Sequence, residues 1–477
     1  MFRSLRGRNY RIWFAGALLS NVGGWMQSTA QNWVVLTELS DNNASAVGVT
    51  MALQFGPQLL LVPFSGAVAD KFDRRRVLMI TQSLLMLCAA ALGVLLITGI
   101  AELWHVYGFA LALGVINSFD ATSRQAFVSD LVQGDQISNA IALNSASFNS
   151  ARLIGPAIAG ILTAAVGSGW VFMINAVSFF AVLIALAAIR PDPAPAEDTA
   201  DREGQLQQLL AGFRYVRHRQ DMLVIFVMVF VLGAFSMNFP IIASTMAVEF
   251  GRDATDYGLL YSMLAIGSLT GALLVARRPA ARMRAVIAAS GGVGVVSLAG
   301  ALMPTFWSFA GSLVFLGFAT ATLLTTANGF VQTTAAPHVR GRVIALYVAV
   351  LMGGTPLGAP IVGAAADSLG ARATLVISAA AGICAFCVGA IWLVTARKLR
   401  LHRGAGWRLR ATHVGRPRLE DDPAEQVETL TAPLDVLRRP AAPIPAETSV
   451  PQETAAVPLT TSSIQLPSRI AKREAEE

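Results

Sequence analysis

The feature that most constrains this chain is a series of long apolar segments, each long enough to cross a lipid bilayer as a helix. A hydrocarbon core about 30 Å thick needs about 20 apolar residues in a helix to span it. With 54% hydrophobic and only 14% charged residues, a soluble fold would have too little polar surface to face water. The sequence therefore predicts an all-α polytopic membrane protein, and it excludes an ordinary cytosolic enzyme and a disordered protein. We predict twelve transmembrane helices, at residues 12–36, 47–69, 77–97, 103–123, 141–166, 170–189, 223–248, 257–276, 285–303, 306–327, 343–366 and 373–396.

Arginine residues gather in every second connection between these spans. The alternate connections contain few arginine residues, only Arg252 and Arg372. Because basic connections stay on the cytoplasmic side, we expect both termini in the cytoplasm and a multi-pass protein of the bacterial cytoplasmic (inner, or plasma) membrane. The formal charge of +7 therefore reflects membrane topology, and no nucleic acid partner is expected.

The chain divides into four parts by composition. Residues 1–189 form an N-terminal six-helix bundle and 222–396 a C-terminal one, joined by a cytoplasmic linker at 190–221 with an amphipathic helix. Residues 397–477 form a cytoplasmic tail, at first basic and then disordered, whose first part touches anionic lipid or binds a partner. The two bundles repeat at an offset of 203, which predicts one two-bundle protein rather than two independent units. The repeat aligns Gly155, Gly160 and Gly167 with Gly358, Gly363 and Gly370.

The connection after the second span carries a recognisable pattern. It reads Gly66-Ala-Val-Ala-Asp70-Lys71-Phe-Asp73-Arg74-Arg75-Arg76 and resembles the major facilitator superfamily signature G-x-x-x-D-[RK]-x-G-R-[RK], with Asp73 at the second glycine. Gly66 allows two helices to approach closely, and Asp70 can accept amide hydrogens from a helix N-terminus of the other bundle. Arg74 and Arg75 can reach an acid at the end of span four, Asp120 or Asp130. The alternative is a plain basic loop.

Further segments resemble one exporter branch of that superfamily, which includes the enterobactin exporter and macrolide-efflux proteins. The resemblance implies the major facilitator fold and export of a drug-like or siderophore-like molecule. Gly155-Pro156 partly matches the helix-five motif of antiporters, and it predicts a bendable, close-packed gating helix between the bundles. The matching segments begin at Asn9-Tyr10-Arg11, Asp120-Ala-Thr-Ser-Arg124, Leu143-Asn144, Asn149-Ser-Ala-Arg152 and Gly341-Arg342.

Polar side chains inside the spans are the candidates for a substrate and proton pathway. Span one places Asn21, Gln27 and Gln31 on one helical face, which lines either a cavity or hydrogen-bonded helix contacts, because amides facing lipid are costly. Further amides of the pathway are Asn144, Asn238 and Asn328, and Pro240 beside Asn238 predicts a kink in span seven.

Two charges, Asp120 and Arg152, lie within the spans of the first bundle, and Arg124 lies one turn below Asp120. A charge at the bilayer centre costs about 2.5–3.5 kcal/mol and so faces a cavity or a partner. We expect Arg152 to be compensated by an acid, by carbonyls or by an anionic substrate, and Asp120 is the candidate acid if span four continues inward past Arg124. Either the pair couples transport to protons or it is a structural ion pair.

No catalytic constellation, metal site or phosphate-binding loop stands out in the sequence. Cys384 and Cys387 lie inside a span and predict no redox site. We therefore predict a secondary transporter, not an enzyme, that needs no cofactor. It should work as a monomer, with a small-molecule substrate, a proton and membrane lipid as its partners. The alternatives are an uptake symporter of the same fold and a non-transporting sensor or scaffold.

Overall fold

A computed structural model describes residues 3–132, 136–189, 212–277, 280–337, 339–396, 399–403 and 409–413. The predicted spans form helices in this structure, one of them interrupted at residues 236–238, which confirms the all-α membrane fold. The helices run longer than the spans at several ends; α4, for example, continues past Arg124 to Asp130.

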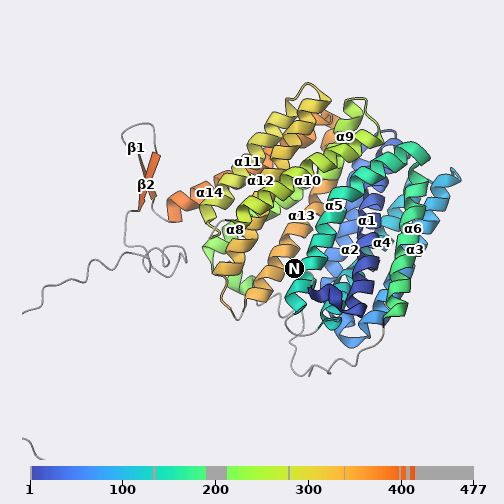
Figure 1. Ribbon diagram of the computed structural model, residues 1–477. Coiled ribbons are helices and arrows are strands. Elements are labelled where there is room, and N and C mark those ends of the chain that lie inside the picture. The colour runs from blue at the N-terminus through green and yellow to red at the C-terminus, as the bar shows by residue number, and fades with distance from the viewer. Residues whose placement is uncertain are drawn as a thin grey trace, which may run out of the picture. The chain divides into compact units, whose positions relative to one another are not determined.

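The first six helices form one bundle, coloured blue to green in Figure 1. Within it, α1 packs against α5 and α6, α3 packs against α4 and α6, and α2 packs against α4. A short 3-10 turn, η1 (Arg3–Arg6), precedes the bundle. The helices are α1 (Arg8–Thr37), α2 (Ala44–Lys71), α3 (Arg74–Ile97), α4 (Leu103–Asp130), α5 (Ile137–Val166) and α6 (Ser168–Ala188).

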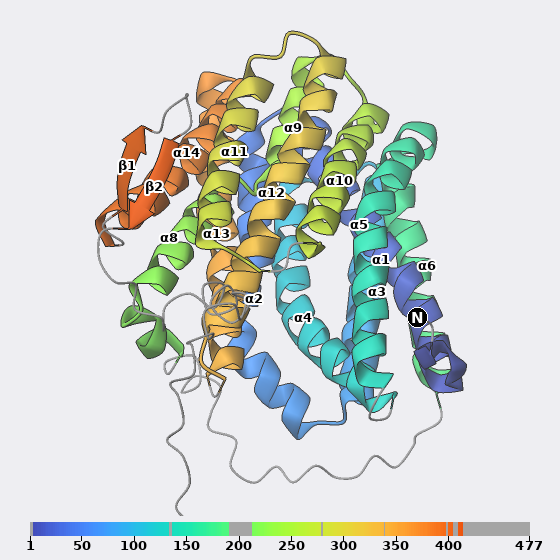
Figure 2. The same ribbon diagram turned by 60° about the vertical axis from the view of Figure 1, so that its left-hand side comes forward.

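The second bundle runs from green to orange and is seen best in Figure 2. Within it, α10 and α11 pack against α12, α11 packs against α14, and α8 packs against α13. The helices are α8 (Gln220–Phe235), α9 (Phe239–Glu249), α10 (Ala254–Ala276), α11 (Met283–Ala301), α12 (Phe306–Thr334), α13 (Arg340–Leu369) and α14 (Arg372–Ala396).

Span seven is interrupted between α8 and α9. Pro240 lies in the first turn of α9, where a missing N–H costs least. The Asn238 side chain donates to the Ala234 carbonyl at 2.5 Å, which satisfies an acceptor at the end of α8. The kink predicted from Pro240 is therefore a full break in the helix.

Two helices of the first bundle are less apolar than the others. Among the described residues, ten segments are long and apolar enough to cross a membrane by length and composition, and α1 and α4 are not among them. Polar side chains are tolerated at membrane depth only where they face protein or water. Helices α1 and α4 therefore owe their place in the membrane to the neighbours that cover them.

The internal repeat is visible in the backbone. Helices α5 and α13 end at Gly167 and Gly370, 203 residues apart, and each glycine has a φ of +90°. Only glycine adopts this conformation readily. The two halves therefore share the same turn at equivalent positions.

Helices α2 and α13 join the bundles through closely approaching backbones. A Cβ atom added at Gly48 would lie 2.5 Å from the Ala359 carbonyl oxygen, and one added at Gly363 would lie 2.5 Å from that of Ala44. These contacts lie at the face of the connections 38–43, 250–253 and 370–371, which we call the outer face. The arginine distribution predicts that this face lies outside the cell.

Helices α5 and α10 form the equivalent pair. A Cβ at Gly258 would lie 2.5 Å from the Pro156 carbonyl oxygen, and one at Gly160 would lie 2.5 Å from that of Ala254. No larger side chain fits at these four glycines without movement of a backbone. Both helix pairs therefore hold the bundles together at the outer face.

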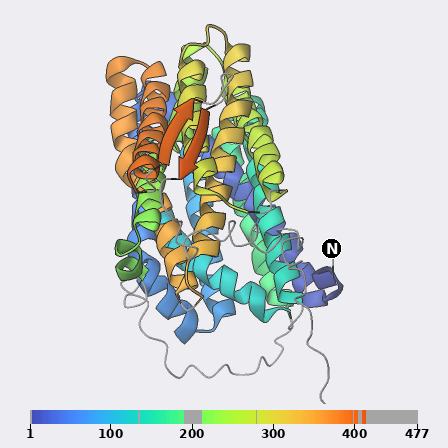
Figure 3. The same cartoon turned by 90° about the vertical axis from the view of Figure 1, so that its left-hand side faces the viewer.

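The linker and the tail are described only in part. Of the predicted linker, residues 190–211 lie outside the described residues, while 212–217 are helical. In this short helix Val216 is buried, and the Tyr215 hydroxyl accepts a hydrogen bond from the Ala336 amide at 3.2 Å. After α14, an antiparallel hairpin of β1 (Leu399–Arg403) and β2 (Leu409–His413) lies where we expected no regular structure (Figure 3). The rest of the tail is outside the described residues.

Candidate functional site

The predicted polar face of α1 makes hydrogen bonds to three neighbouring helices. Asn21 Nδ2 donates to Ser147 Oγ of α5 at 3.1 Å. Gln27 Oε1 accepts from an amide of α6 at 2.5 Å, and Gln31 Nε2 lies 3.5 Å from an amide oxygen of α2. Gln27 and Gln31 are buried. Of the two interpretations of this face, a cavity lining or hydrogen bonding between helices, the second describes these contacts. A role of the three residues in a transport pathway stays a prediction.

A buried charge cluster surrounds Asp120. One carboxylate oxygen accepts from Thr81 Oγ1 at 2.8 Å and Gln82 Nε2 at 2.6 Å. The other pairs with Arg124 at 3.0 Å, and the Arg124 guanidinium lies over the Trp13 ring, 5.6 Å from its centroid. Asp120 is only 4% exposed. The carboxylate is thus satisfied by partners on α3 and on its own helix, and Trp13 of α1 covers the paired arginine.

The pairing of Asp120 with Arg152 that we expected is wrong. Helix α4 does continue past Arg124, but the Asp120 carboxylate turns toward α3 and toward its own helix. Partner choice depends on how each helix is rotated, and spacing along the chain leaves that open. Among the described side chains, Arg152 has no hydrogen-bond or ion-pair partner; it is exposed and interacts electrostatically with Tyr261 of α10.

Arg152 lies just inside the closed contact between α5 and α10. Pro156, one helical turn away, is the residue that touches Gly258, and Tyr261 lies about one turn beyond Gly258 on α10. Residues four apart share a helix face. Arg152 and Tyr261 therefore face each other across the two bundles, next to the outer closure.

Aromatic side chains from both bundles surround this position. The hydroxyls of Tyr257 and Tyr261 lie 3.4 Å apart. The Trp33 ring of α1 stacks on Tyr257 with centroids 5.4 Å apart, and Phe239 of α9 meets Tyr261 edge-on at 4.8 Å. Our sequence analysis overlooked this aromatic cluster, because its members come from three helices and share no local spacing.

Three further amides belong to the predicted pathway, and one of them, Asn238, directly precedes Phe239 of this cluster. Asn144 is half-buried on α5, two turns before Arg152. Asn238 is fully buried, and its Oδ1 has no partner among the described residues. Asn328 Oδ1 accepts from Gln332 Nε2 at 2.9 Å. Their place in a transport pathway stays a prediction.

The basic loop after α2 is held by its own charges. Arg74 reaches Asp130 at 2.5 Å, one of the two acids we expected, and Arg75 donates to the carbonyl of Ala187 at 3.2 Å. Asp73 caps α3 by accepting from the Arg75 amide at 2.9 Å. The helix cap explains why an aspartate serves where the superfamily signature has glycine.

The other gating residues separate into two groups. Gly66 is buried and Asp70 is exposed at the end of α2. Gly155 packs within its own bundle, since a Cβ there would lie 2.7 Å from the Cβ of Trp25 on α1. Pro156 alone of the predicted Gly155-Pro156 pair touches the other bundle, so the prediction of an interface between bundles holds for one residue of the two.

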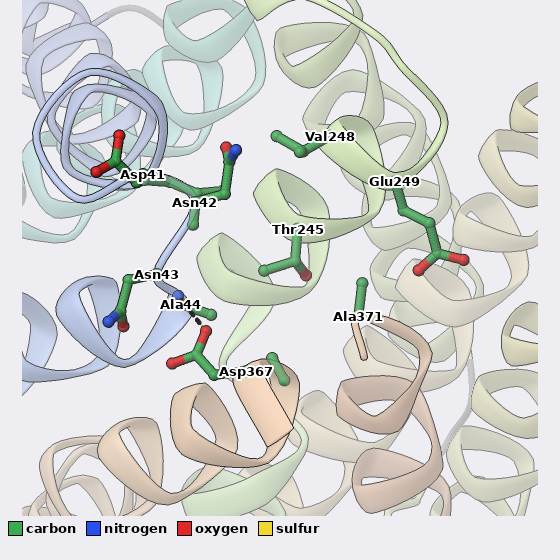
Figure 4. A pocket seen from close by; sticks show the side chains of 11 residues that line it. Asp41, Asn42, Asn43, Ala44, Thr245, Val248, Glu249, Asp367 and Ala371 are labelled. Atoms are coloured by element: carbon green, nitrogen blue, oxygen red, sulfur yellow. Dashed lines mark hydrogen bonds between the residues drawn. The ribbon is translucent and has the colours of Figure 1, made fainter. Parts of the chain in front are cut away.

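A pocket of about 500 Å³ opens at the outer face, where the bundles meet (Figure 4). Asp367 of α13 points at the start of α2, while Thr245 and Val248 of α9 lie across the pocket. This pocket is far from Asp120 in the fold and was not predicted, because its walls come from segments more than 300 residues apart.

The chain is similar to known transport proteins over most of its length. The family model described as transmembrane secretion effector matches residues 1–402. The staphyloferrin A transporter of Staphylococcus aureus is 24% identical over 82% of this chain and 97% of its own. The multidrug efflux pump Tap of Mycolicibacterium fortuitum is 27% identical over 78% and 93%, and the enterobactin exporter EntS of Escherichia coli is 26% identical over 77% and 88%.

Solved structures share the fold. A bacterial homologue of the human lysosomal transporter Spinster, in an inward-facing and unoccupied conformation, superposes with a TM-score of 0.65 at 13% identity, over 81% of this chain and 98% of its own. The nucleoside transporter NupG gives 0.65 at 12% identity, over 80% and 98%. With the family match, these likenesses establish a multi-pass membrane transporter: the chain belongs to the transmembrane secretion effector family of the major facilitator superfamily.

Proposed function

We propose that this protein exports an amphiphilic organic molecule by alternating access, driven by the proton gradient. Export is favoured by relatives named as a multidrug efflux pump and an enterobactin exporter. Secondary transport agrees with a sequence that carries no phosphate-binding loop. A single chain holds both bundles, so we expect the monomer to be the working unit.

The observation that carries the proposal is the position of Arg152. It lacks a polar partner among the described side chains and faces Tyr261 of the other bundle. Transporters of this architecture bind substrate near the midplane at the interface between their repeats. A cation that faces Tyr261, with Phe239 packed on the same ring, suits a substrate with a planar apolar part and an acidic or hydrogen-bond-accepting group.

Proton coupling is proposed through Asp120. It is the only buried carboxylate among the described residues. Its protonation would leave Arg124 uncompensated, and an uncompensated buried cation favours a rearrangement of the helices around it. Asn21, Gln27, Gln31, Asn144, Asn238 and Asn328 complete the proposed pathway.

A resistance panel in a host lacking its own exporters tests the function. We expect resistance to a subset of amphiphilic compounds, and accumulation of the same compounds in inside-out vesicles once the lumen is made acidic. Accumulation in right-side-out vesicles instead would identify an uptake symporter. Absence of transport, together with a cellular response lost on deletion of residues 397–477, would identify a sensor.

A thiol-labelling experiment tests the proposed orientation. Asn43 caps α2 through the Ala46 amide, so Ile100, which is 62% exposed, is the better position for a cysteine. In a background without native cysteines, Ile100→Cys should react with an impermeant thiol reagent on intact cells. Reaction only after lysis would place the termini outside.

A further inference from the structure

The outer face holds a polar contact between the bundles that transport alone does not explain. Asp367, in the last turn of α13, accepts from the Ala44 amide at 2.6 Å and from the Ser45 amide at 2.8 Å. It also accepts from the Ser45 hydroxyl. Figure 4 shows the carboxylate aimed at the first residue of α2. A side chain of one bundle thus caps a helix of the other.

The start of α2 needs this cap. The first amides of any helix have no partner within the helix and attract negative charge. Asn43, the residue before α2, accepts only from the Ala46 amide, at 3.1 Å. The amides of Ala44 and Ser45 donate to Asp367 instead. These hydrogen bonds break whenever the bundles separate at this face.

The repeat supplies a matched helix without such a contact. Residues Asn43-Ala44-Ser45 and Gly48 of α2 correspond to Asp253-Ala254-Thr255 and Gly258 of α10 at an offset of 210. Helix α10 is capped by its own Asp253, which accepts from the Thr255 amide at 3.0 Å and the Asp256 amide at 3.1 Å. At the offset of 203, the residue equivalent to Asp367 is Ala164 of α5. The backbone packing is symmetric, but of these two helices only α2 is capped by a carboxylate of the other bundle.

We propose that Asp367 is the gating residue of the outer face: it holds α2 and α13 together there and must leave the α2 N-terminus before the outer face opens. The 500 Å³ pocket gives water access to the contact, because Asp367 itself lines it. Water can thus replace the carboxylate at the amides of Ala44 and Ser45 as the bundles part.

The same two helices carry a second aspartate at their opposite ends. Helices α2 and α13 are antiparallel, since Ala44 meets Gly363 and Gly48 meets Ala359. Asp70, in the last turn of α2, therefore corresponds to Asp367, and the start of α13 corresponds to the start of α2. Each helix carries a carboxylate in its last turn. The structure shows the contact of Asp367 with α2, and we expect the contact of Asp70 with the start of α13 in the alternate state, when the cytoplasmic side is closed.

Electron-paramagnetic-resonance distances between the bundles test the gate. The exposed residues Ile100 and Leu302 lie in outer connections of the first and second bundle and serve as label sites, in a background without native cysteines, in lipid nanodiscs without substrate. Asp367→Asn should raise the ratio of open to closed distances about fivefold to tenfold, as expected for loss of a charge at a helix N-terminus. Asp367→Glu, which keeps the charge, should stay near the parent ratio.

Asp253→Asn is the control, because it removes the charge of a carboxylate at a helix N-terminus that makes no contact between bundles. It should leave the distances unchanged. An unchanged ratio in Asp367→Asn, or an equal shift in Asp253→Asn, would overturn the proposal. If Asp367→Asn fails to fold, Ser45→Ala must give a smaller shift in the same direction, and no shift would again overturn it. The inference rests on the proposed function only in assuming that the transport cycle opens this face. Because the distances are measured without transport, the gating proposal and the transport proposal can each fail alone.

Discussion

The two bundles have the same helices and the same glycine contacts, yet their buried chemistry differs. In the first bundle Asp120, Arg124 and Arg152 lie within the helices. The equivalent positions of the second bundle, at the offset of 203, are Leu323, Ala327 and Thr355. Leu323 and Ala327 are fully buried in an apolar core, and the Thr355 hydroxyl lies 3.4 Å from the Gly233 carbonyl of a neighbouring helix.

We propose that closure of the transporter and its specificity depend on different residues. Packing of small residues is symmetric, so each helix pair contributes to closure. The charges are asymmetric, so we propose that the first bundle carries substrate contact and proton coupling, while the second contributes aromatic side chains such as Tyr261. Four experiments test this division, and they follow in order of expected effect.

The largest effect is expected from breaking the Asp120–Arg124 pair. Asp120→Leu leaves a buried arginine without its partner, which should destabilise the protein by about 3–5 kcal/mol. Adding Arg124→Ala makes the first bundle resemble the second at both positions, and thermal stability should return. Thermal unfolding in detergent measures both variants. If the double variant is stable and still transports with its pH dependence intact, Asp120 has no part in coupling.

A smaller effect is expected from Arg152→Gln. Losing a hydrogen bond to a charged group costs about 1.5–3 kcal/mol, so transport of an aromatic acid should fall about tenfold to a hundredfold. Transport of its neutral amide should change little. Thr355→Gln, at the equivalent position of the second bundle, is the matched control. Equal losses for acid and amide in Arg152→Gln would remove the charge preference from the proposal.

Filling the glycine contacts should affect the two helix pairs alike. Gly48→Val and Gly258→Val each insert a side chain against a backbone carbonyl, at a cost of about 1–3 kcal/mol to the closed outer face. Distances between labels at Ile100 and Leu302 should lengthen in both. Gly108→Val is the control, since a Cβ there meets nothing within 4 Å. A shift in only one of the pairs would contradict the symmetry of closure.

The smallest effect is expected from Asp70→Asn. If Asp70 caps α13 when the cytoplasmic side is closed, the variant should favour the inward-open state about twofold to fivefold. Turnover should fall while the amount of folded protein changes little. Asp70→Asn and Asp367→Asn should shift the same label distances in opposite directions, and a shift in the same direction would contradict the exchange between the two contacts.

The spans, the repeat and the basic loop could be predicted from the sequence because they depend on local properties. Hydropathy over about 20 residues determines a span, and the glycines ending α5 and α13 repeat at a fixed offset. Asp130 could also be predicted as a partner of Arg74, because both residues lie at helix ends on the same face. The break before Pro240 was predicted as a kink from the missing N–H.

Only the tertiary structure decided which charges and aromatic rings meet. Asp120 turns to Arg124 rather than Arg152 because helix rotation about its own axis, which no spacing reveals, sets the direction of a side chain. Trp33, Tyr257 and Tyr261 gather from two bundles, and Asp367 reaches Ala44 across 323 residues of chain. The sequence determined where the spans lie, since a span follows from the composition of its own segment, although α1 and α4 also depend on the helices that cover them. The partners depended on packing between helices distant in sequence.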